Sequence, residues 1–136
     1  MSVGLLLITH NRIGDELLDT ARKMLGICPL LTNTLAVTAE DDLDGLRERA
    51  RAAVRELDQG DGVLVLTDMF GSTPSNIAAD LREISTVNVV AGINLPMLVR
   101  VLNYPSLSLE QLTNKATSGG YDGILRCRQA SGGGGA

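Results

Sequence analysis

Four apolar runs of strand length lie along this chain, and each is followed by a stretch in which apolar residues recur at helical spacing. The runs are Val3–Thr9, Thr34–Val37, Val63–Thr67 and Val87–Ala91, of which the second is the weakest. Runs without alternating polar positions are typical of strands that are covered on both faces. We therefore predict four strands, most of them buried.

The stretches after the runs predict five helices. Thr73 followed by Pro74 has the form of an N-cap and a first-turn proline, which indicates a helix start. We expect helices through Leu17–Leu25, from Asp41 and Asp42 through an apolar face that ends at Leu57, from Thr73 to about Arg82, over Met97–Leu102 after Pro96, and over Ser108–Thr117.

Strand and helix alternating four times favour a three-layer α/β/α fold with a mainly parallel sheet and right-handed crossovers. In the strand order 2-1-3-4 the first and third strands are neighbours, and ligands of such sheets bind beyond the carboxyl ends of the strands, where the order reverses. We expect one domain over residues 1–130, with a last short edge strand at Gly123–Arg128. A flexible Gly-rich tail is expected at 131–136.

Composition narrows the class of protein. Hydrophobic residues make up 44% of the 136, but aromatic residues only 2% and there is no Trp, so the core must be aliphatic. A formal net charge of −4 gives no support to binding of nucleic acid or of an anionic membrane. No run approaches the roughly 20 residues that span a bilayer, and the first lacks the basic flank of a signal peptide. Cys28 and Cys127 match no metal or redox spacing, so we expect reduced thiols in a cytoplasmic protein.

His10, the single histidine, comes directly after the first apolar run. An isolated histidine is more often structural than catalytic, but loops at this edge of an α/β sheet are where sites are built. Imidazole acts as a nucleophile through one ring nitrogen when the other holds the proton. Asp68 follows the third run and would meet His10 if the two strands are adjacent; its carboxylate would then fix the tautomer and stabilise the cationic ring. The alternative is a turn aspartate at a helix entry.

The segment after Asp68 offers what a phosphoryl group needs. Gly71 lets the backbone approach closely, and Ser72 and Thr73 carry hydroxyl donors. The free N–H groups of the helix that follows favour an anion. No Gly-Lys-Ser/Thr sequence follows, so this is not a Walker A loop and a nucleotide site is unsupported. The alternative is a capped helix start and nothing more.

The same loop contains Met69 and Phe70, and Phe70 is the only Phe in the chain. These residues could form an apolar rim on which a partner protein docks, or Phe70 could be a loop anchor that packs inward.

Other chemistries are poorly supported. A zinc site would need more His or Cys near His10, and a serine hydrolase would need a Gly-x-Ser-x-Gly elbow. We expect no metal and no cofactor.

Three segments resemble the IIA component of the mannose class of the bacterial phosphoenolpyruvate-dependent sugar phosphotransferase system (PTS). They occur in the family's order and span most of the chain. They are Leu7–His10 with Gly14 beyond it, Val65–Asn76 with the pattern Asp-x-x-Gly-x-x-Pro-x-Asn, and Val90–Leu98 with the pattern Gly-x-Asn-x-Pro-Met.

The resemblance implies that His10 takes a phosphoryl group from the histidine of the carrier protein HPr and that Asp68 orients the imidazole. It implies that Thr73, with the backbone at Gly71 and Ser72, receives the phosphoryl oxygens, and we add Thr9 to these predicted contacts. It also implies a IIB-type acceptor and a homodimer. In that dimer the C-terminal strand Gly123–Arg128, expected to be antiparallel, pairs with the partner's sheet. Many family members have Gly after the histidine, where this chain has Asn11.

Other functions stay open at this point. The phosphocarrier subunit of dihydroxyacetone kinase shares the fold and an N-terminal histidine, although the Gly71–Asn76 stretch argues against it. In a regulatory binding module, phosphorylation of His10 would only change which partner is held, and the acceptor would be a regulator. In a small-molecule sensor, His10 would never be phosphorylated.

Overall fold

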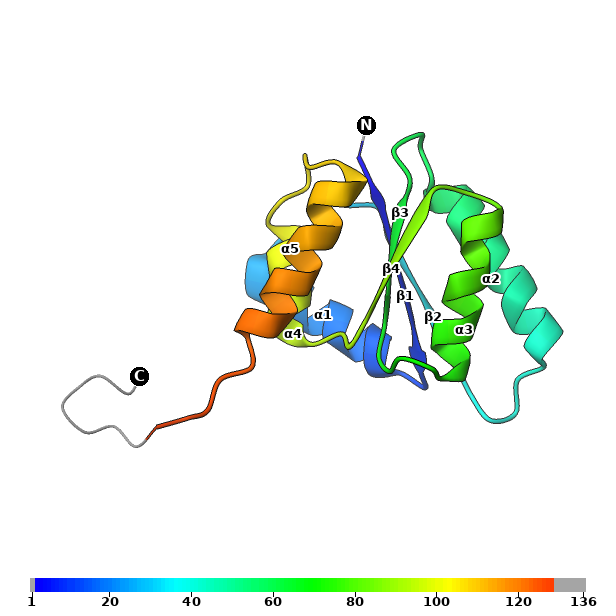
Figure 1. Ribbon diagram of the computed structural model, residues 1–136, viewed down its shortest axis with the longest axis horizontal. Coiled ribbons are helices and arrows are strands. Elements are labelled where there is room, and N and C mark those ends of the chain that lie inside the picture. Colours follow the sequence, from blue (N-terminus) through cyan, green and yellow to red (C-terminus); the bar gives the residue numbers. More distant parts are fainter. Residues whose placement is uncertain (1, 129–136) are drawn as a thin grey trace.

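The computed structural model describes residues 2–128 and shows a four-stranded parallel sheet between two layers of helices (Figure 1). The predicted strand order is confirmed as β2-β1-β3-β4. The strands are β1 (Gly4–His10), β2 (Thr32–Val37), β3 (Val63–Thr67) and β4 (Val87–Ala91). The predicted Gly-rich tail lies outside the described residues.

The helices divide between the two faces of the sheet. Helices α2 and α3 cover one face, and α1, α4 and α5 cover the other (Figure 1). Their bounds are Ile13–Leu25 (α1), Leu43–Leu57 (α2), Thr73–Asp80 (α3), Leu95–Leu102 (α4) and Leu109–Asp122 (α5), with a short 3-10 turn at Leu81–Glu83 after α3. Among these described helices, none is long and apolar enough to cross a membrane.

Several helix ends differ from the sequence prediction, and α1 begins at Ile13, four residues before the predicted Leu17. The N-cap of α3 is Ser72, one residue before the predicted Thr73. Helix α4 begins before Pro96, because the Asn94 side chain accepts a hydrogen bond from the Met97 N–H and caps it. Helix α5 continues past the predicted end at Thr117 to Asp122 and includes Gly119 and Gly120.

The core is aliphatic and lies on both sides of the sheet. Side chains of a strand alternate between its faces, so Leu5 and Leu7 of β1 pack toward α1, α4 and α5, whereas Leu6 and Ile8 pack toward α2 and α3. All four are fully buried, and each such side chain contributes about 1.5–3 kcal/mol when it leaves water. Because this alternation fixes the register, His10 falls on the same face as Ile8.

The turn before β3, at the edge of the sheet opposite His10, is organised by Asp58. Its carboxylate accepts hydrogen bonds from the Ser85 hydroxyl and from the N–H groups of Gly60 and Gly62. The bonds from Ser85 and Gly60 outweigh the effect of burial, so the pKa of Asp58 lies below its ordinary value.

The predicted strand Gly123–Arg128 does not form in the single chain. After α5 the backbone leaves the domain without a strand partner (Figure 1), and the side chains of Ile124 and Leu125 are 77% and 79% exposed. A strand requires a ladder of hydrogen bonds to a neighbour, and one chain supplies none at this place. We refer to residues 124–128 as the C-terminal arm.

Candidate functional site

His10 and Asp68 lie side by side at the carboxyl edge of the sheet. Strands β1 and β3 are adjacent, with Ile8 opposite Thr67, so the residues that follow meet beyond the strand ends. Asp68 Oδ2 accepts a hydrogen bond from the His10 backbone N–H at 3.0 Å and lies 2.9 Å from the His10 Nδ1. The structure therefore brings together the pair that strand order predicted.

This contact distinguishes the two nitrogens of the ring. A carboxylate only accepts hydrogen bonds, so Nδ1 is the protonated nitrogen when it bonds to Asp68. The lone pair of the neutral ring is then on Nε2. The His10 side chain is 43% exposed and that of Asp68 only 12%, so the orienting group is covered while the ring remains accessible to a partner.

Asp68 stays ionised in this position. Burial raises the pKa of its carboxyl, but the hydrogen bonds from the His10 ring and the His10 N–H, with the attraction of the ring, outweigh it, and the pKa lies below the ordinary value. The second oxygen, Oδ1, is buried without a hydrogen-bond partner among the described residues. A negative charge is thus maintained beside Nδ1.

The turn after β1 explains one departure from the family pattern. Asn11 has a φ of 48°, in the left-handed region that glycine adopts most easily and that Asn tolerates better than most residues.

The predicted role of Thr9 needs correction. Its side chain is buried, and its Oγ1 accepts a hydrogen bond from the Gly14 N–H at 2.8 Å. Thr9 therefore supports the start of α1 and is not placed to contact a phosphoryl group.

The loop after Asp68 presents backbone N–H groups at the start of α3. Gly71 has a φ of 82°, which turns the chain into the helix. The Ser72 hydroxyl donates to the Met69 carbonyl at 2.6 Å, so it organises the loop and is not the free donor that we predicted. The first hydrogen bond of the helix runs from the Asn76 N–H to the Ser72 carbonyl. The N–H groups of Thr73 and Ser75 therefore have no partner within the helix.

A cavity of about 470 Å³ adjoins His10. Thr73 lines it together with His10, and a second wall comes from Thr38 and Asp41 of the β2–α2 loop and from Leu43, the first residue of α2. Sequence reasoning missed this second wall. The signal was available, because Val37 ends the strand that pairs with β1 and lies opposite His10.

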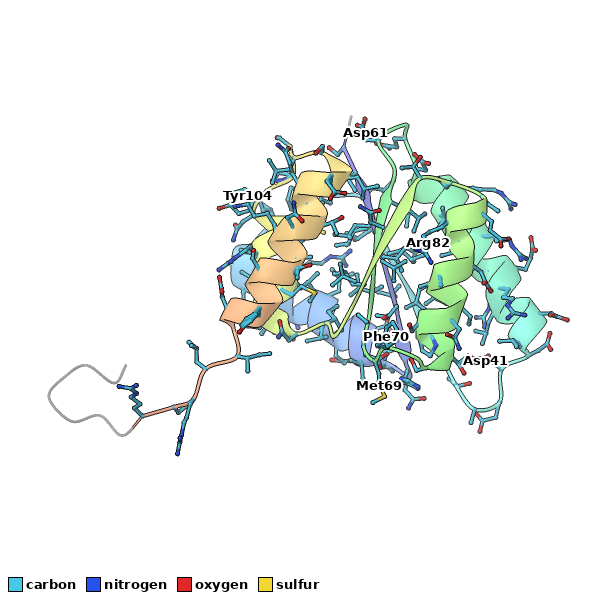
Figure 2. The ribbon with its side chains drawn as sticks, in the orientation of Figure 1. Asp41, Asp61, Met69, Phe70, Arg82 and Tyr104 are labelled. Atoms are coloured by element: carbon cyan, nitrogen blue, oxygen red, sulfur yellow. The ribbon has the colours of Figure 1, made fainter. Side chains whose placement is uncertain are left out.

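Met69 and Phe70 point out of the loop. Their side chains are 63% and 86% exposed, and Figure 2 shows both at the same edge of the molecule as Asp41. The alternative of an inward-packed anchor is therefore wrong, and the docking role stays a prediction. Within residues 2–128, no three His, Cys, Asp or Glu side chains form a group that could hold a metal ion.

The family model described as the PTS system fructose IIA component matches residues 4–116. The chain belongs to this family of IIA components. It is 29% identical over 127 residues to the mannose-specific EIIAB component of Escherichia coli K12, covering 91% of this chain but 39% of that protein. It is 36% identical over 76 residues to the fructose-specific EIIA component of Bacillus subtilis, covering 54% of this chain and 52% of that one.

The fold comparison agrees. A mannose/sorbose-specific IIA subunit from Enterococcus faecalis superimposes with a TM-score of 0.85 at 28% identity, over 95% of this chain and 97% of that chain. This chain spans less than two thirds of the length of the first curated relatives it matches. It is thus similar to the IIA portion of those longer proteins.

Proposed function

We propose that this IIA component is a cytoplasmic phosphocarrier that accepts a phosphoryl group from phospho-HPr on Nε2 of His10 and passes it to a IIB-type acceptor. The observation that carries the proposal is the contact between Asp68 Oδ2 and His10 Nδ1. It makes Nε2 the nucleophile, and it places a negative charge beside the ring that becomes positive as the new bond forms.

The transfer balances without a cofactor. Nε2 donates its lone pair to phosphorus, while the nitrogen–phosphorus bond of the donor histidine breaks and its electron pair returns to that ring. The proton on Nδ1 of His10 stays in its hydrogen bond to Asp68. The Thr73 side chain in the cavity wall and the free N–H groups at the start of α3 are the groups we assign to the phosphoryl oxygens.

Radiolabelled phosphoenolpyruvate, enzyme I and HPr test the first step. We expect label that is labile to acid and stable to alkali, as for a phosphohistidine, and its loss in His10→Ala. Because His10 is the only histidine, label that survives this substitution contradicts the proposal.

The second step needs a separate measurement. The isolated phosphorylated chain is mixed with a IIB-type protein, and the label on each is followed with time. Movement of label to IIB supports the carrier function. Stable label on His10, together with a binding partner that recognises only one phosphorylation state, would instead indicate the regulatory module.

A further inference from the structure

The β4–α4 turn, Gly92–Asn94, belongs to the Gly-x-Asn-x-Pro-Met segment, for which the proposed phosphoryl transfer gives no role. The backbone N–H groups of Gly92 and Ile93 donate to one oxygen, the carbonyl of Thr67, at 2.9 and 3.0 Å. Thr67 is the last residue of β3, so this carbonyl belongs to the peptide group that leads into Asp68. Two donors on one carbonyl hold the plane of that peptide, and with it the positions of the Asp68 N and Cα atoms from which the side chain extends.

Asn94 holds this turn in place. Gly92 has a φ of 95°, and nothing lies within 4 Å of the position that a Cβ would take, so within the turn only Ile93 packs against the core, and Asn94 supplies the polar side-chain contacts. Asn94 Oδ1 accepts from the Met97 N–H at 2.9 Å, and its Nδ2 donates to the Gly120 carbonyl of α5 at 3.1 Å. A single side chain therefore ties the turn both to the start of α4 and to the end of α5.

The end of α5 is fitted closely against the start of α4, and the two helices lie side by side (Figure 1). Glycines stand at the points of contact. A Cβ on Gly120 would lie 2.7 Å from Met97 Cε, and one on Gly123 would lie 2.4 Å from the Cβ of Pro96. In packing this close, a movement of the end of α5 is passed on to the first turn of α4.

We propose that Asn94 is a positioning residue for the phosphoryl acceptor. By anchoring the β4–α4 turn to α5, it holds the Thr67–Asp68 peptide and so keeps the Asp68 carboxylate against His10. This inference rests on the proposed function of His10. The position of Asp68 is demanding, because one oxygen accepts from both the backbone N–H and the ring of His10, at 3.0 and 2.9 Å. A small rotation of the peptide before Asp68 would break one of these bonds.

The variant Asn94→Asp separates the two bonds of Asn94. Its carboxylate still accepts from the Met97 N–H and caps α4, but it has no hydrogen to donate to the Gly120 carbonyl. Asn88→Asp is the matched control. Asn88 lies on β4 and, like Asn94, donates through Nδ2 to α5, to Thr113 Oγ1 at 3.0 Å and to Glu110 Oε2 at 3.3 Å. It pairs with Leu64, away from the carboxyl end of β3.

Two measurements follow the effect. Nitrogen-detected NMR of the unphosphorylated chain, with a neutral His10 ring, gives the share of the tautomer that is protonated on Nδ1. Rapid-quench transfer from phospho-HPr gives the maximal rate and the half-saturating donor concentration. We expect Asn94→Asp to lower the Nδ1–H share and to reduce the maximal rate about three- to tenfold, the range that one hydrogen bond sets. The half-saturating concentration should be unchanged, and Asn88→Asp should match the wild type in all three.

An unchanged tautomer share in folded Asn94→Asp overturns the proposal, as does an equal change in Asn88→Asp. If Asn94→Asp does not fold, Asn94→Ser replaces it, since Ser also caps a helix and lacks the Nδ2 amide. A wild-type chain that takes no phosphoryl group on His10 overturns the proposed function, while the tautomer measurement still decides the role of Asn94.

Discussion

Replacing Asp68 by Asn tests the pairing on which the phosphoryl chemistry depends. Asn has nearly the same size, but a neutral amide takes the place of the carboxylate that accepts from the His10 N–H and faces Nδ1. The amide oxygen can still accept a hydrogen bond from the ring. What is lost is the negative charge that favours the cationic form of the ring.

The size of the effect follows from distance and exposure. Two unit charges about 4 Å apart attract by about 4 kcal/mol at an effective dielectric constant of 20. The His10 side chain is 43% exposed, so water screens the pair, and the appropriate range is roughly 1.5–3 kcal/mol, that of a hydrogen bond to a charged group. At about 1.36 kcal/mol per decade, we expect phosphoryl transfer to slow about 10- to 100-fold.

Rapid-quench kinetics with radiolabelled phospho-HPr at saturating concentration measure this rate. Asp58→Asn is the control, because it removes a carboxylate of similar local bonding at the opposite edge of the sheet, where it does not contact His10. A folded Asp68→Asn variant that transfers at the wild-type rate would refute the reasoning. A loss of equal size in Asp58→Asn would do so as well, since the effect would then be one of general stability.

Four further predictions follow from other parts of the chain. The pKa of Asp58 is lower in the folded chain than in the unfolded chain, so its carboxylate contributes fully to the free energy of unfolding above the unfolded pKa of about 3.9. That contribution is lost as the pH falls through the lower, folded pKa. In urea titrations, Asp58→Asn should therefore have a lower free energy of unfolding than the wild type at neutral pH and an equal one in strong acid. Thr9→Val removes the acceptor of the Gly14 N–H and should lower the free energy of unfolding by about 1–3 kcal/mol, measured by the same urea titration; no loss would show that this buried bond is dispensable. Full-length chain should scatter light as a dimer of about twice 14.4 kDa, and deletion from Gly123 onward should leave a monomer or aggregate; a full-length monomer at micromolar concentration contradicts the exchange of the arm. Phe70→Ala should raise the half-saturating concentration of phospho-HPr and leave the maximal rate unchanged, because Phe70 is exposed beside the site and contacts neither His10 nor Asp68 by a hydrogen bond; an unchanged half-saturating concentration removes Phe70 from the docking surface.

Hydrophobic patterning was sufficient for the sheet and for the central pair of the site. The apolar runs that became β1 and β3 are continuous because both faces are covered. The point at which each run ends therefore identifies the polar residue that lies at the carboxyl edge of the sheet. Once the strand order is 2-1-3-4, His10 and Asp68 have to be neighbours. Their meeting was therefore predictable without any side-chain detail.

Side-chain direction was beyond the sequence. Thr9 and Ser72 both carry hydroxyls next to the site, yet each bonds to nearby backbone, because such short polar side chains compete for local N–H and carbonyl groups. Asn94 was missed as a cap although its bond to the Met97 N–H is local and Pro96 follows it. Its second bond, to the Gly120 carbonyl, joins residues 26 apart in the sequence and could not be predicted from local pattern. The C-terminal arm was predicted as a strand from its residues, but strand formation depends on a partner that one chain does not supply.

The exclusion of aromatic side chains from the core has a spectroscopic consequence. The chain has one Phe, two Tyr and no Trp, and Phe70, Tyr104 and Tyr121 all lie at the surface. Tyr121 is in the last turn of α5, three residues before Ile124, where the arm begins. Unfolding of the aliphatic core will therefore change the near-ultraviolet signal very little, and far-ultraviolet circular dichroism has to be used for it. If the predicted dimer covers the end of α5, its dissociation on dilution should change the tyrosine emission, to which Tyr104 and Tyr121 both contribute, and no attached dye is needed.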